Sequence, residues 1–400
     1  MDLGFSSEEQ SFREEVRAFC KAKLPAHLRR KLVLQQRLKY EDYAEWQRIL
    51  DDQGWAVPHW PAEWGGQGWS AMKLYIFNEE LQQFPAPPPD MHNGSLLGPV
   101  LMAFGTEEQK QHFLPKLRRL DYWFCQGLSE PGSGSDLASL KTRAVRDGDN
   151  YIVNDQKLWT SYGHASNWMF ALVRTDPEAQ KQKGISYLLI DMKSPGITVR
   201  PIITLGREHQ VNEVFFDNVK VPVANRVGEE NKGWGIGKHS LGNERVNLGR
   251  VGLSKHRVRF AKGLMQQVRE GESTLAENVR LREKVALIEV ELKAIEITQM
   301  RVVSDMEKNN KNRADPKASI LKLKGTELQQ ATQELLLEIA GPFSVPQQTA
   351  FYCQGGAKEL EGPDWAATVA PGYFFARSRS ITGGSSEIQH NIIAKAILGL

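Results

Sequence analysis

The sequence has little of the chemistry that marks disulfide-stabilised or metal-binding proteins. Only three cysteines occur in 400 residues, Cys20, Cys125 and Cys353, and no two of them have C-x-x-C spacing. This usage supports neither a disulfide framework nor a zinc site and is typical of a reducing compartment, so we expect a cytoplasmic location. The nine histidines show no H-E-x-x-H or comparable ligand spacing, and we expect no metal.

Long apolar runs and a strong charge of either sign are also missing. No uninterrupted apolar run approaches the roughly 18 residues of a membrane span. Residues 1–5 (M-D-L-G-F) begin with an acidic residue after Met1 and lack a basic region followed by an apolar core, so we expect no signal peptide. A net charge of +3 is small for this length, so we expect no nucleic-acid partner. The chain has no P-loop or G-x-S-x-G elbow, and G-W-G-I-G at 233–237 does not match the G-x-G-x-x-G dinucleotide pattern.

Helical and strand patterns predict three parts and an α+β multidomain fold. Residues 1–120 show helical patterns, with Ser7 as the expected N-cap of the first helix and a capping box (T-E-E-Q) at 106–109 opening the last. Residues 121–228 contain short β-rich segments and a hairpin turn (D-G-D-N) at 147–150. Because no long helical pattern interrupts these segments, an antiparallel β domain is favoured over a parallel α/β sheet.

Residues 229–400 are predicted to be helical again. Residues 341–372, rich in glycine, proline and aromatic residues, are expected to form one long connection, followed by an apolar C-terminal helix. Before this connection, apolar residues recur at helical spacing in two stripes that would face a common core. The stripes comprise Val285, Ile288, Leu292 and Ile295, and Leu321, Leu328 and Leu335.

Two short segments have residue types that suit a polar, aromatic cofactor. Residues 128–136 (L-S-E-P-G-S-G-S-D) combine two glycines, which let a backbone approach a bound group closely, with three serines that offer hydrogen bonds without bulk. An ordinary surface turn is the alternative. Trp159, Thr160 and Ser161 offer an indole beside two hydroxyls, which suits a flat cofactor ring but also a plain core position.

Six segments, in order along nearly the whole chain, resemble the acyl-CoA dehydrogenase family. The branch that the chain resembles includes large subunits of pimeloyl-CoA dehydrogenase and steroid side-chain dehydrogenases. The resemblance implies an N-terminal helical domain at 1–120, a middle β domain at 121–228 and a C-terminal four-helix bundle at 229–400. The segments are W-G-G-Q-G at 64–68, F-G-T-E-E-Q-K at 104–110, S-E-P-G-S-G-S-D at 129–136, N-D-Q-K-L-W-T-S at 154–161, V-K-V-P at 219–222 and G-G-S-S-E-I at 383–388.

The resemblance also implies FAD, bound non-covalently between the β domain and the bundle, with its adenine end reaching a neighbouring subunit. Ser385 and Glu387 would close the site from the C-terminal side, and Glu338 and Gly341 would serve the adenine end. By motif position, the flavin ring and ribityl chain would be lined by Gln126, Leu128, Ser129, Gly134, Ser135, Trp159, Thr160 and Ser161.

The family oxidises an acyl thioester to its trans-2-enoyl form, which requires a carboxylate base. Many members carry this base as a glutamate at the position that is Gly383 here, whereas another branch places it beside an arginine on the first helix of the C-terminal domain. Glu244 and Arg245 occupy that second place. A Glu-Arg pair on a helix is by itself usually a solvated face, but the resemblance makes Glu244 the expected catalytic base.

Substrate contacts are also expected by resemblance. Arg245 would bind the CoA adenine or phosphate, or pair with a neighbouring acid, and the Gly384 backbone N–H would stabilise the thioester oxygen. Gly242, Gly249 and Gly252 indicate a roomy pocket for bulky, branched or dicarboxylic chains, or else close helix packing. The expected substrate-binding residues are Ser135, Gly242, Arg245 and Gly384.

Two departures from the family concern the adenine end of FAD. The R-x-x-F-G segment has no counterpart between Lys262 and Arg280, Glu338 stands where a glutamine is usual, and Pro342 replaces a glycine. A homotetramer and an α2β2 heterotetramer with a second acyl-CoA dehydrogenase-like subunit both stay open, and electrons would pass to an electron-transfer flavoprotein. The alternatives are a non-catalytic or half-site subunit of such a heterotetramer, and an acyl-CoA oxidase-like or flavin N-hydroxylase relative.

Overall fold

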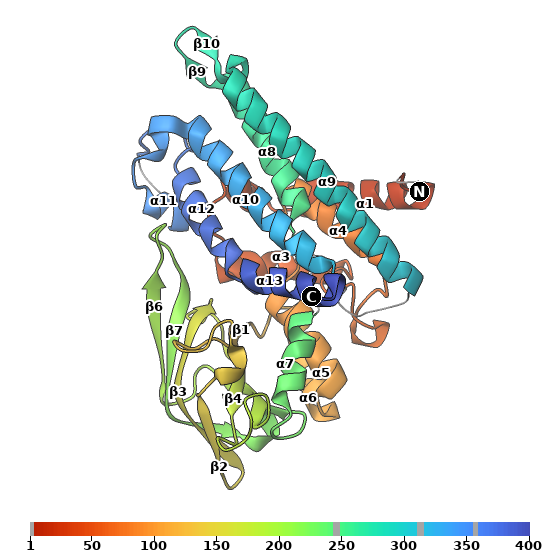
Figure 1. The fold of residues 1–400 in the computed structure, drawn as a ribbon, viewed down its shortest axis with the longest axis vertical. Coiled ribbons are helices and arrows are strands. Elements are labelled where there is room, and N and C mark those ends of the chain that lie inside the picture. Colours follow the sequence, from red (N-terminus) through yellow and green to blue (C-terminus); the bar gives the residue numbers. More distant parts are fainter. Residues whose placement is uncertain (1–3, 243–248, 310–315, 355–358) are drawn as a thin grey trace.

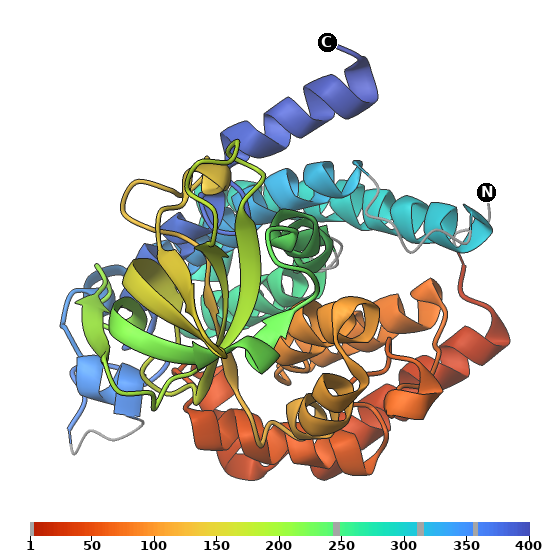
Figure 2. The ribbon, with the colours of Figure 1, turned by 90° about the horizontal axis from the view of Figure 1, so that it is seen from below.

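The computed structural model describes residues 4–242, 249–309, 316–354 and 359–400, whose arrangement is shown in Figure 1. Two groups of helices, one from each end of the chain, pack together, and a β-sheet from the middle of the chain lies beside them (Figure 2). This order of helices, strands and helices is the predicted one, while the limits at residues 120 and 228 stay a prediction.

The N-terminal helices surround a core of aromatic and aliphatic side chains. Trp46 and Leu50 on one helix, and Phe77 and Leu81 on another, are each at most 1% exposed. The spacing of four residues puts each pair on one helix face, directed at the shared core. The helices are α1 (Ser7–Lys23), α2 (Ala26–Val33), α3 (Tyr40–Asp52), α4 (Ala71–Gln83), α5 (Gly98–Phe104) and α6 (Glu107–Arg118), with a 3-10 turn at Ala62–Trp64 and a π-helix at Met91–Leu97.

One predicted helix start is confirmed and another is wrong by one residue. Thr106 Oγ1 accepts the Gln109 N–H at 3.2 Å and Gln109 Oε1 accepts the Thr106 N–H at 3.1 Å, which is the predicted capping box of α6. At α1, Ser6 rather than Ser7 is the N-cap. A capping box needs a spacing of three residues, and Ser6 has that spacing to Glu9.

The sheet has eight strands in the order β6-β7-β3-β2-β4-β5-β8, with β1 paired to β4. Its main ladders are antiparallel, as expected, and the predicted turn at 147–150 joins β2 to β3. The sheet also contains parallel pairings of β4 with β1 and, at one residue pair, with β2, because long connections rather than hairpins join these strands. The strands are β1 (Phe124–Gly127), β2 (Arg143–Asp147), β3 (Asn150–Ser161), β4 (Trp168–Arg174), β5 (Ile185–Asp191), β6 (Ile197–Ile203), β7 (His209–Pro222) and β8 (Arg226–Val227).

The C-terminal helices pack through the two predicted stripes. Figure 1 shows three long helices, α8, α9 and α10, lying side by side. Six stripe residues are buried in one core, with Ile288 partly buried beside them: Val285, Leu292, Ile295, Leu321, Leu328 and Leu335. The elements are α7 (Gly233–Gly242), α8 (Val251–Gln267), β9 (Arg269–Glu270), β10 (Ser273–Thr274), α9 (Val279–Asn309), α10 (Ala318–Ala340), α11 (Thr349–Gln354), α12 (Val369–Ala376), the 3-10 helix η8 (Arg377–Ser380) and α13 (Ser386–Ile393).

The prediction of one long connection at 341–372 is wrong. α11 lies within this stretch and α12 begins before its end. Phe351 and Tyr352 on α11 are 6% and 3% exposed, so tertiary burial stabilises a helix too short for a periodic pattern to reveal. The expected C-terminal helix is α13, which projects from the rest of the molecule in Figure 2. Within the described ranges, no helix has the length and apolar character needed to cross a bilayer.

Candidate functional site

The loop after β1 lies directly against the end of β3, so the two segments singled out in the sequence are neighbours. The Leu158 N–H donates to the Ser129 carbonyl at 2.8 Å, and Lys157 Nζ donates to the Leu128 carbonyl at 3.3 Å. Gln126 lies two residues earlier, on β1, where it pairs with Phe170 of β4. The beginning of the loop is therefore tied to the strand that carries the predicted indole and hydroxyls.

A buried ion pair between Glu130 and Lys157 secures this junction. Lys157 Nζ is 2.7 Å from Glu130 Oε1 and also donates to the Leu172 carbonyl at 2.7 Å, and the Lys157 side chain has no exposed surface. Glu130 accepts three further hydrogen bonds, from the backbone N–H groups of Lys141 and Thr142 and from the Thr142 hydroxyl. Burial raises the pKa of Glu130, but Lys157 and these donors outweigh it, so the net shift is downward.

Sequence reasoning missed this pair, although both residues lie inside the quoted motifs. Lys157 shares the odd numbering of the buried Tyr151 and Val153, so strand alternation gave a signal that it points inward. A lysine at an inward position calls for a carboxylate partner, because an unpaired buried charge is costly. Glu130 is that partner, and the pair holds the loop in position relative to β3.

A β-bulge at the end of β3 presents the predicted indole to the outside. Lys157 pairs with Val214 and Thr160 with Asn212, so β3 has one residue more than β7 in this interval. Trp159 occupies the bulge with a φ of 61° and leaves 58% of its surface exposed. An L residue in this left-handed conformation costs about 1–2 kcal/mol. Bulges of this kind re-aim side chains beside functional sites.

The residues around Trp159 fit a flat cofactor with a polar chain. Thr160 is 1% exposed, and its hydroxyl has no hydrogen-bond partner among the described residues. Ser135 is exposed, and a Cβ added at Gly134 would meet nothing within 4 Å, so this part of the loop leaves open space. An exposed indole, an unpaired hydroxyl and an open loop with serine donors together suit a flavin and its ribityl chain.

The C-terminal motif forms a turn that exposes a backbone donor. Gly383 and Gly384 have φ values of 70° and 89°, and a Cβ on Gly384 would lie 2.6 Å from Gln389 Nε2, so only glycine fits. Among the described residues the Gly384 N–H has no acceptor. Ser385 is the N-cap of α13, where its hydroxyl accepts the Ile388 N–H. Glu387 is exposed, and its hydrogen bond with Ser385 lowers its pKa.

Glu338 and Gly341 lie apart from the loop within this chain. Glu338 Oε2 pairs with Lys284 Nζ at 2.6 Å on the surface, and Gly341 ends α10 with a φ of 50°. Figure 1 shows α10 ending near α11, at the end of the bundle away from β1. An assignment of these two residues to the adenine end of a cofactor on another subunit does not require closeness to the loop, and it stays a prediction.

The predicted base and CoA-binding arginine, Glu244 and Arg245, lie outside the described residues. Gly242 is the last residue of α7. Two glycines after the gap pack closely: a Cβ at Gly252 would lie 2.8 Å from the Glu79 carbonyl oxygen, and Gly249 Cα lies 2.4 Å from a Cβ built on Gly325. For Gly249 and Gly252, the structure therefore favours close helix packing over a role in widening a pocket.

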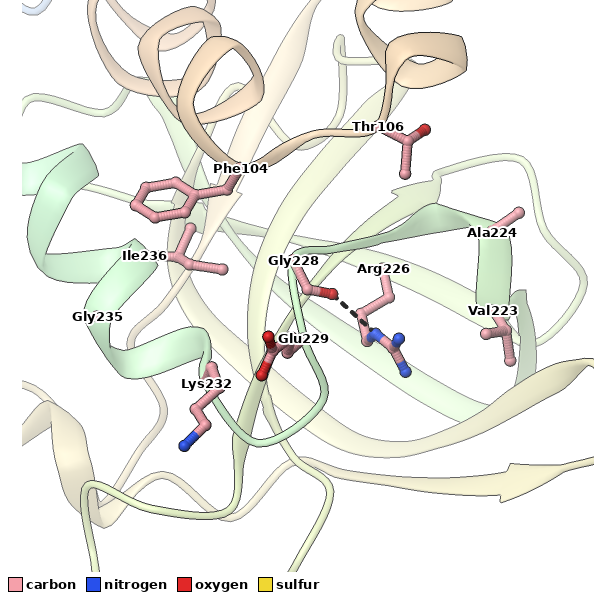
Figure 3. Close-up of a pocket in the computed structure, with 10 residues that line it drawn as sticks. All are labelled: Phe104, Thr106, Val223, Ala224, Arg226, Gly228, Glu229, Lys232, Gly235 and Ile236. Atoms are coloured by element: carbon pink, nitrogen blue, oxygen red, sulfur yellow. Dashed lines mark hydrogen bonds between the residues drawn. The ribbon is translucent and has the colours of Figure 1, made fainter.

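A groove of about 690 Å³ lies elsewhere, between α5, β8 and the start of α7 (Figure 3). Figure 3 shows Phe104 and Ile236 facing one part of it and Arg226, whose Nε donates to the Gly228 carbonyl at 3.0 Å, in another. None of the residues predicted to bind cofactor or substrate lines this groove. The groove is therefore separate from the predicted site at the β1–β3 junction, which stays a prediction.

Comparison with known proteins identifies the family of the chain. Family models of the acyl-CoA dehydrogenase N-terminal, middle and C-terminal domains match residues 6–121, 125–219 and 231–398. The chain belongs to the acyl-CoA dehydrogenase family, a class of oxidoreductases.

Individual relatives cover most or all of the chain. It is 32% identical over 410 residues to acyl-CoA dehydrogenase FadE26 of Mycobacterium tuberculosis, which covers 100% of this chain and 99% of the relative. Acyl-CoA dehydrogenase IpdE1 of the same organism is 34% identical over 363 residues, covering 90% and 89%. Among solved structures, the Tcur3481-Tcur3483 steroid ACAD has a TM-score of 0.84 at 30% identity, and the ChsE4-ChsE5 complex from M. tuberculosis 0.83 at 31%. Each covers 100% of this chain and 99% of its own.

Proposed function

We propose that the protein catalyses FAD-dependent α,β-dehydrogenation of an acyl-CoA thioester to the trans-2-enoyl-CoA. The main observation behind the proposal is the β3 bulge. Its strained backbone exposes Trp159 next to the Thr160 hydroxyl, which has no hydrogen-bond partner among the described residues, at the point where the loop from Ser129 is hydrogen-bonded to β3. Family membership supplies the reaction class. When bound, FAD supplies the acceptor for the hydride that leaves the β-carbon of the substrate.

The chain's own residues would hold the cofactor from two sides. Gln126, Leu128 and Ser129 would line one side of the flavin, next to Trp159, Thr160 and Ser161. The Glu130–Lys157 pair would keep these two segments in register, so that the distance between them does not change when the ligand binds. Gly134 and Ser135 would reach the ribityl chain, and Ser385 and Glu387 would close the site from α13.

Glu244 would remove the α-proton of the substrate. Its candidacy rests on its position between α7 and α8 and on Gly383, which leaves no carboxylate at the family's other base position. Negative charge would develop on the thioester oxygen as the proton leaves, and the Gly384 N–H, which has no acceptor among the described residues, would stabilise it. Arg245 would bind the CoA moiety.

The proposal is tested by flavin bleaching. We expect the purified protein to be yellow, to bleach anaerobically with a suitable acyl-CoA, and to lose this reduction in Glu244→Gln. Glu272→Gln, in the exposed β9–β10 turn, is the matched control and should bleach like the wild type. Retained bleaching in Glu244→Gln would exclude Glu244 as the base, and a colourless protein with intact fold would count against FAD.

We also propose assembly into a homotetramer or an α2β2 heterotetramer, with electron transfer to an electron-transfer flavoprotein. The missing R-x-x-F-G segment and the similarity to the ChsE4-ChsE5 complex, which contains two different proteins, support a second, unlike subunit. Ile381 and Leu398, 70% and 63% exposed near the C-terminus, offer apolar surface for such contacts. Native mass spectrometry of the protein, expressed alone and with a candidate second subunit, distinguishes the two assemblies.

The missing segment also motivates a second candidate function, a non-catalytic or half-site subunit of a heterotetramer. On this reading the chain expressed alone would hold no flavin, and flavin would appear only after co-expression with the second subunit. Yellow protein from the chain alone, bleached by an acyl-CoA, would exclude it.

A further inference from the structure

Asn212 of β7 lies opposite Thr160, at the point where the β3 bulge closes. The two residues are partners in the β3–β7 ladder, and Asn212 has no exposed surface. Asn212 Nδ2 donates to the Thr160 carbonyl at 2.9 Å, which adds a side-chain hydrogen bond to the strand pairing directly after Trp159. Since Trp159 has a strained φ of 61°, an anchored residue beside it stabilises the bulge in this conformation.

Two histidines share the rest of the Asn212 amide. Asn212 Nδ2 lies 3.2 Å from His164 Nδ1, and Asn212 Oδ1 lies 2.7 Å from His209 Nε2. Both histidines are exposed, and their imidazole rings lie beside each other, with centroids 3.9 Å apart and planes inclined by 33°. One buried amide therefore connects Thr160, inside the candidate flavin site, to a pair of titratable rings at the surface.

The Thr160 carbonyl determines which atoms of this network carry protons. A backbone carbonyl only accepts hydrogen bonds, so the NH2 group of Asn212 must face it, and the second hydrogen of that group is left for His164. His164 Nδ1 accepts this hydrogen bond and must be unprotonated. His209 Nε2 donates to the Asn212 oxygen and must carry a proton. The complete network therefore requires a neutral His164.

Acid disrupts the network at His164. A proton on Nδ1 would direct one N–H group at another, and it would place a positive charge beside the ring of His209. Burial lowers the pKa of His164 from its usual value of 6.5, and the charge of His209 lowers it further. The neutral ring is thus the prevailing form at pH 7, and it is lost as the pH falls through the lowered value.

The other titratable groups nearby are engaged in their own contacts. The hydroxyl of Tyr162, in the same turn as His164, accepts a hydrogen bond from Gln210 Nε2 at 3.3 Å. Glu208, one residue before the second histidine, is 1% exposed and pairs with Arg37. Apart from the second histidine, no charged side chain of the described residues contributes to the pKa shift of His164. The state of the network therefore depends on the two histidines.

We propose that Asn212 is a positioning residue for the flavin-facing end of β3, and that it holds Thr160 in place only while His164 is neutral. This inference rests on the proposed function, in which Trp159, Thr160 and Ser161 line the flavin. The site would be well ordered at neutral and alkaline pH and would loosen on acidification. Acid would thus weaken FAD binding through a group that does not touch the cofactor.

The positions of the protons are tested without substrate, by ¹⁵N NMR of protein labelled at its histidines. Above neutral pH, we expect His164 with an unprotonated Nδ1 and His209 with a protonated Nε2. The signals of His164 are assigned by their loss in His164→Asn. A protonated Nδ1 of His164 under these conditions would overturn the inference, because the ring could not then accept from Asn212.

The FAD dissociation constant, measured by flavin fluorescence from neutral to acidic pH, tests the effect on the site. In the wild type it should rise as His164 takes up its proton. His164→Asn offers an amide oxygen as acceptor near the place of Nδ1 and does not titrate, so its dissociation constant should not show this rise. Asn212→Ala should raise the constant about tenfold at neutral pH and remove its dependence on His164, since a lost buried hydrogen bond is worth that much.

Two substitutions outside the network serve as matched controls. Asn154→Ala removes an asparagine of β3 whose side chain bonds across to Asn218 of β7 on the exposed surface. His27→Asn removes an exposed histidine of α2, which lies 3.1 Å from Glu45. Both variants should keep the FAD dissociation constant of the wild type and its dependence on pH.

Two results in the binding experiment would overturn the inference. One is an unchanged dissociation constant in Asn212→Ala, and the other is the same rise in acid for the wild type and His164→Asn. If circular dichroism shows that Asn212→Ala does not fold, the comparison of the wild type with His164→Asn decides. A wild type that binds no FAD at any pH removes the proposed function and this inference with it, whereas FAD binding that ignores these substitutions removes only the inference.

Discussion

Two groups of charged residues inside the protein differ in the ratio of positive to negative side chains. At the β1–β3 junction, Lys157 and Glu130 are matched one to one, and surrounding donors and acceptors satisfy both. In a second cluster, formed by Arg37, Arg250, Arg257 and Arg379, Glu208 pairs with Arg37, and no other carboxylate of the described residues pairs with these guanidinium groups. A balanced pair is complete without a ligand and can hold a loop in place. The difference separates a pair that is complete within the described residues from a cluster in which they leave an excess of positive charge.

We expect the largest loss of stability from a substitution that removes one member of the Glu130–Lys157 pair. Lys157→Met leaves Glu130 buried without its cation and should lower the free energy of unfolding by about 3–5 kcal/mol. Urea denaturation of the wild type and the variant measures this loss. The double variant Glu130→Gln/Lys157→Met should recover most of it, because no uncompensated charge remains. A single variant as stable as the wild type would show that the pair does not support the junction.

Acid should disturb the same pair for the same reason. The folded-state pKa of Glu130 is depressed, so its contribution to stability is full above the usual glutamate pKa of 4.5 and is lost as the pH falls through the folded value. Thermal midpoints measured from neutral to acidic pH should therefore fall more steeply in the wild type than in Glu130→Gln/Lys157→Met. Parallel curves for the two proteins would contradict the assigned shift.

A smaller effect is expected from one of the donors to the pair. Thr142 has no exposed surface, and its hydroxyl donates to Glu130 Oε1 at 2.5 Å. Thr142→Val keeps the shape and removes this bond, which should lower the free energy of unfolding by about 1–3 kcal/mol. Thr274→Val removes a comparable hydroxyl contact with Glu277 on the exposed surface and should change stability much less. Equal losses would mean that burial of the pair is unimportant.

The smallest effect on stability is expected in the arginine cluster. Arg379→Gln removes a cation that is repelled by its neighbours but stacks on Phe375, and these contributions oppose each other. Without ligand, the free energy of unfolding should change by less than about 1 kcal/mol, as measured by urea denaturation. A loss as large as that of Lys157→Met would show that the cluster is a structural element like the first pair.

Local sequence patterns predicted much of the fold because the relevant interactions are local. The capping box at Thr106 and the stripes of α9 and α10 depend on residues three or four positions apart, and they are confirmed. The first N-cap was misplaced by one residue because both Ser6 and Ser7 can cap a helix, and only the contact with Glu9 decides between them. α11 was missed because its burial depends on distant partners.

In the candidate site, too, features that depend on residue type were predictable, and features that depend on strand register were not. The loop and Trp159 could be singled out by residue type, and the structure brings them together. The bulge that exposes Trp159 was not predictable, because it depends on the register between β3 and β7. Glu244 and Arg245 lie outside the described residues, so their roles stay predictions.

By itself, the sequence determined the family, the order of helices and strands, and the types of residue available for binding a cofactor. Each of these depends on residues within contiguous segments. The tertiary structure decided which charged side chains have an oppositely charged partner. Glu130 and Lys157 come from separate motifs, and Arg37, Glu208 and Arg379 are separated by more than a hundred residues each. Only folding brings such residues within a few ångströms, where Coulomb and desolvation energies become large enough to matter.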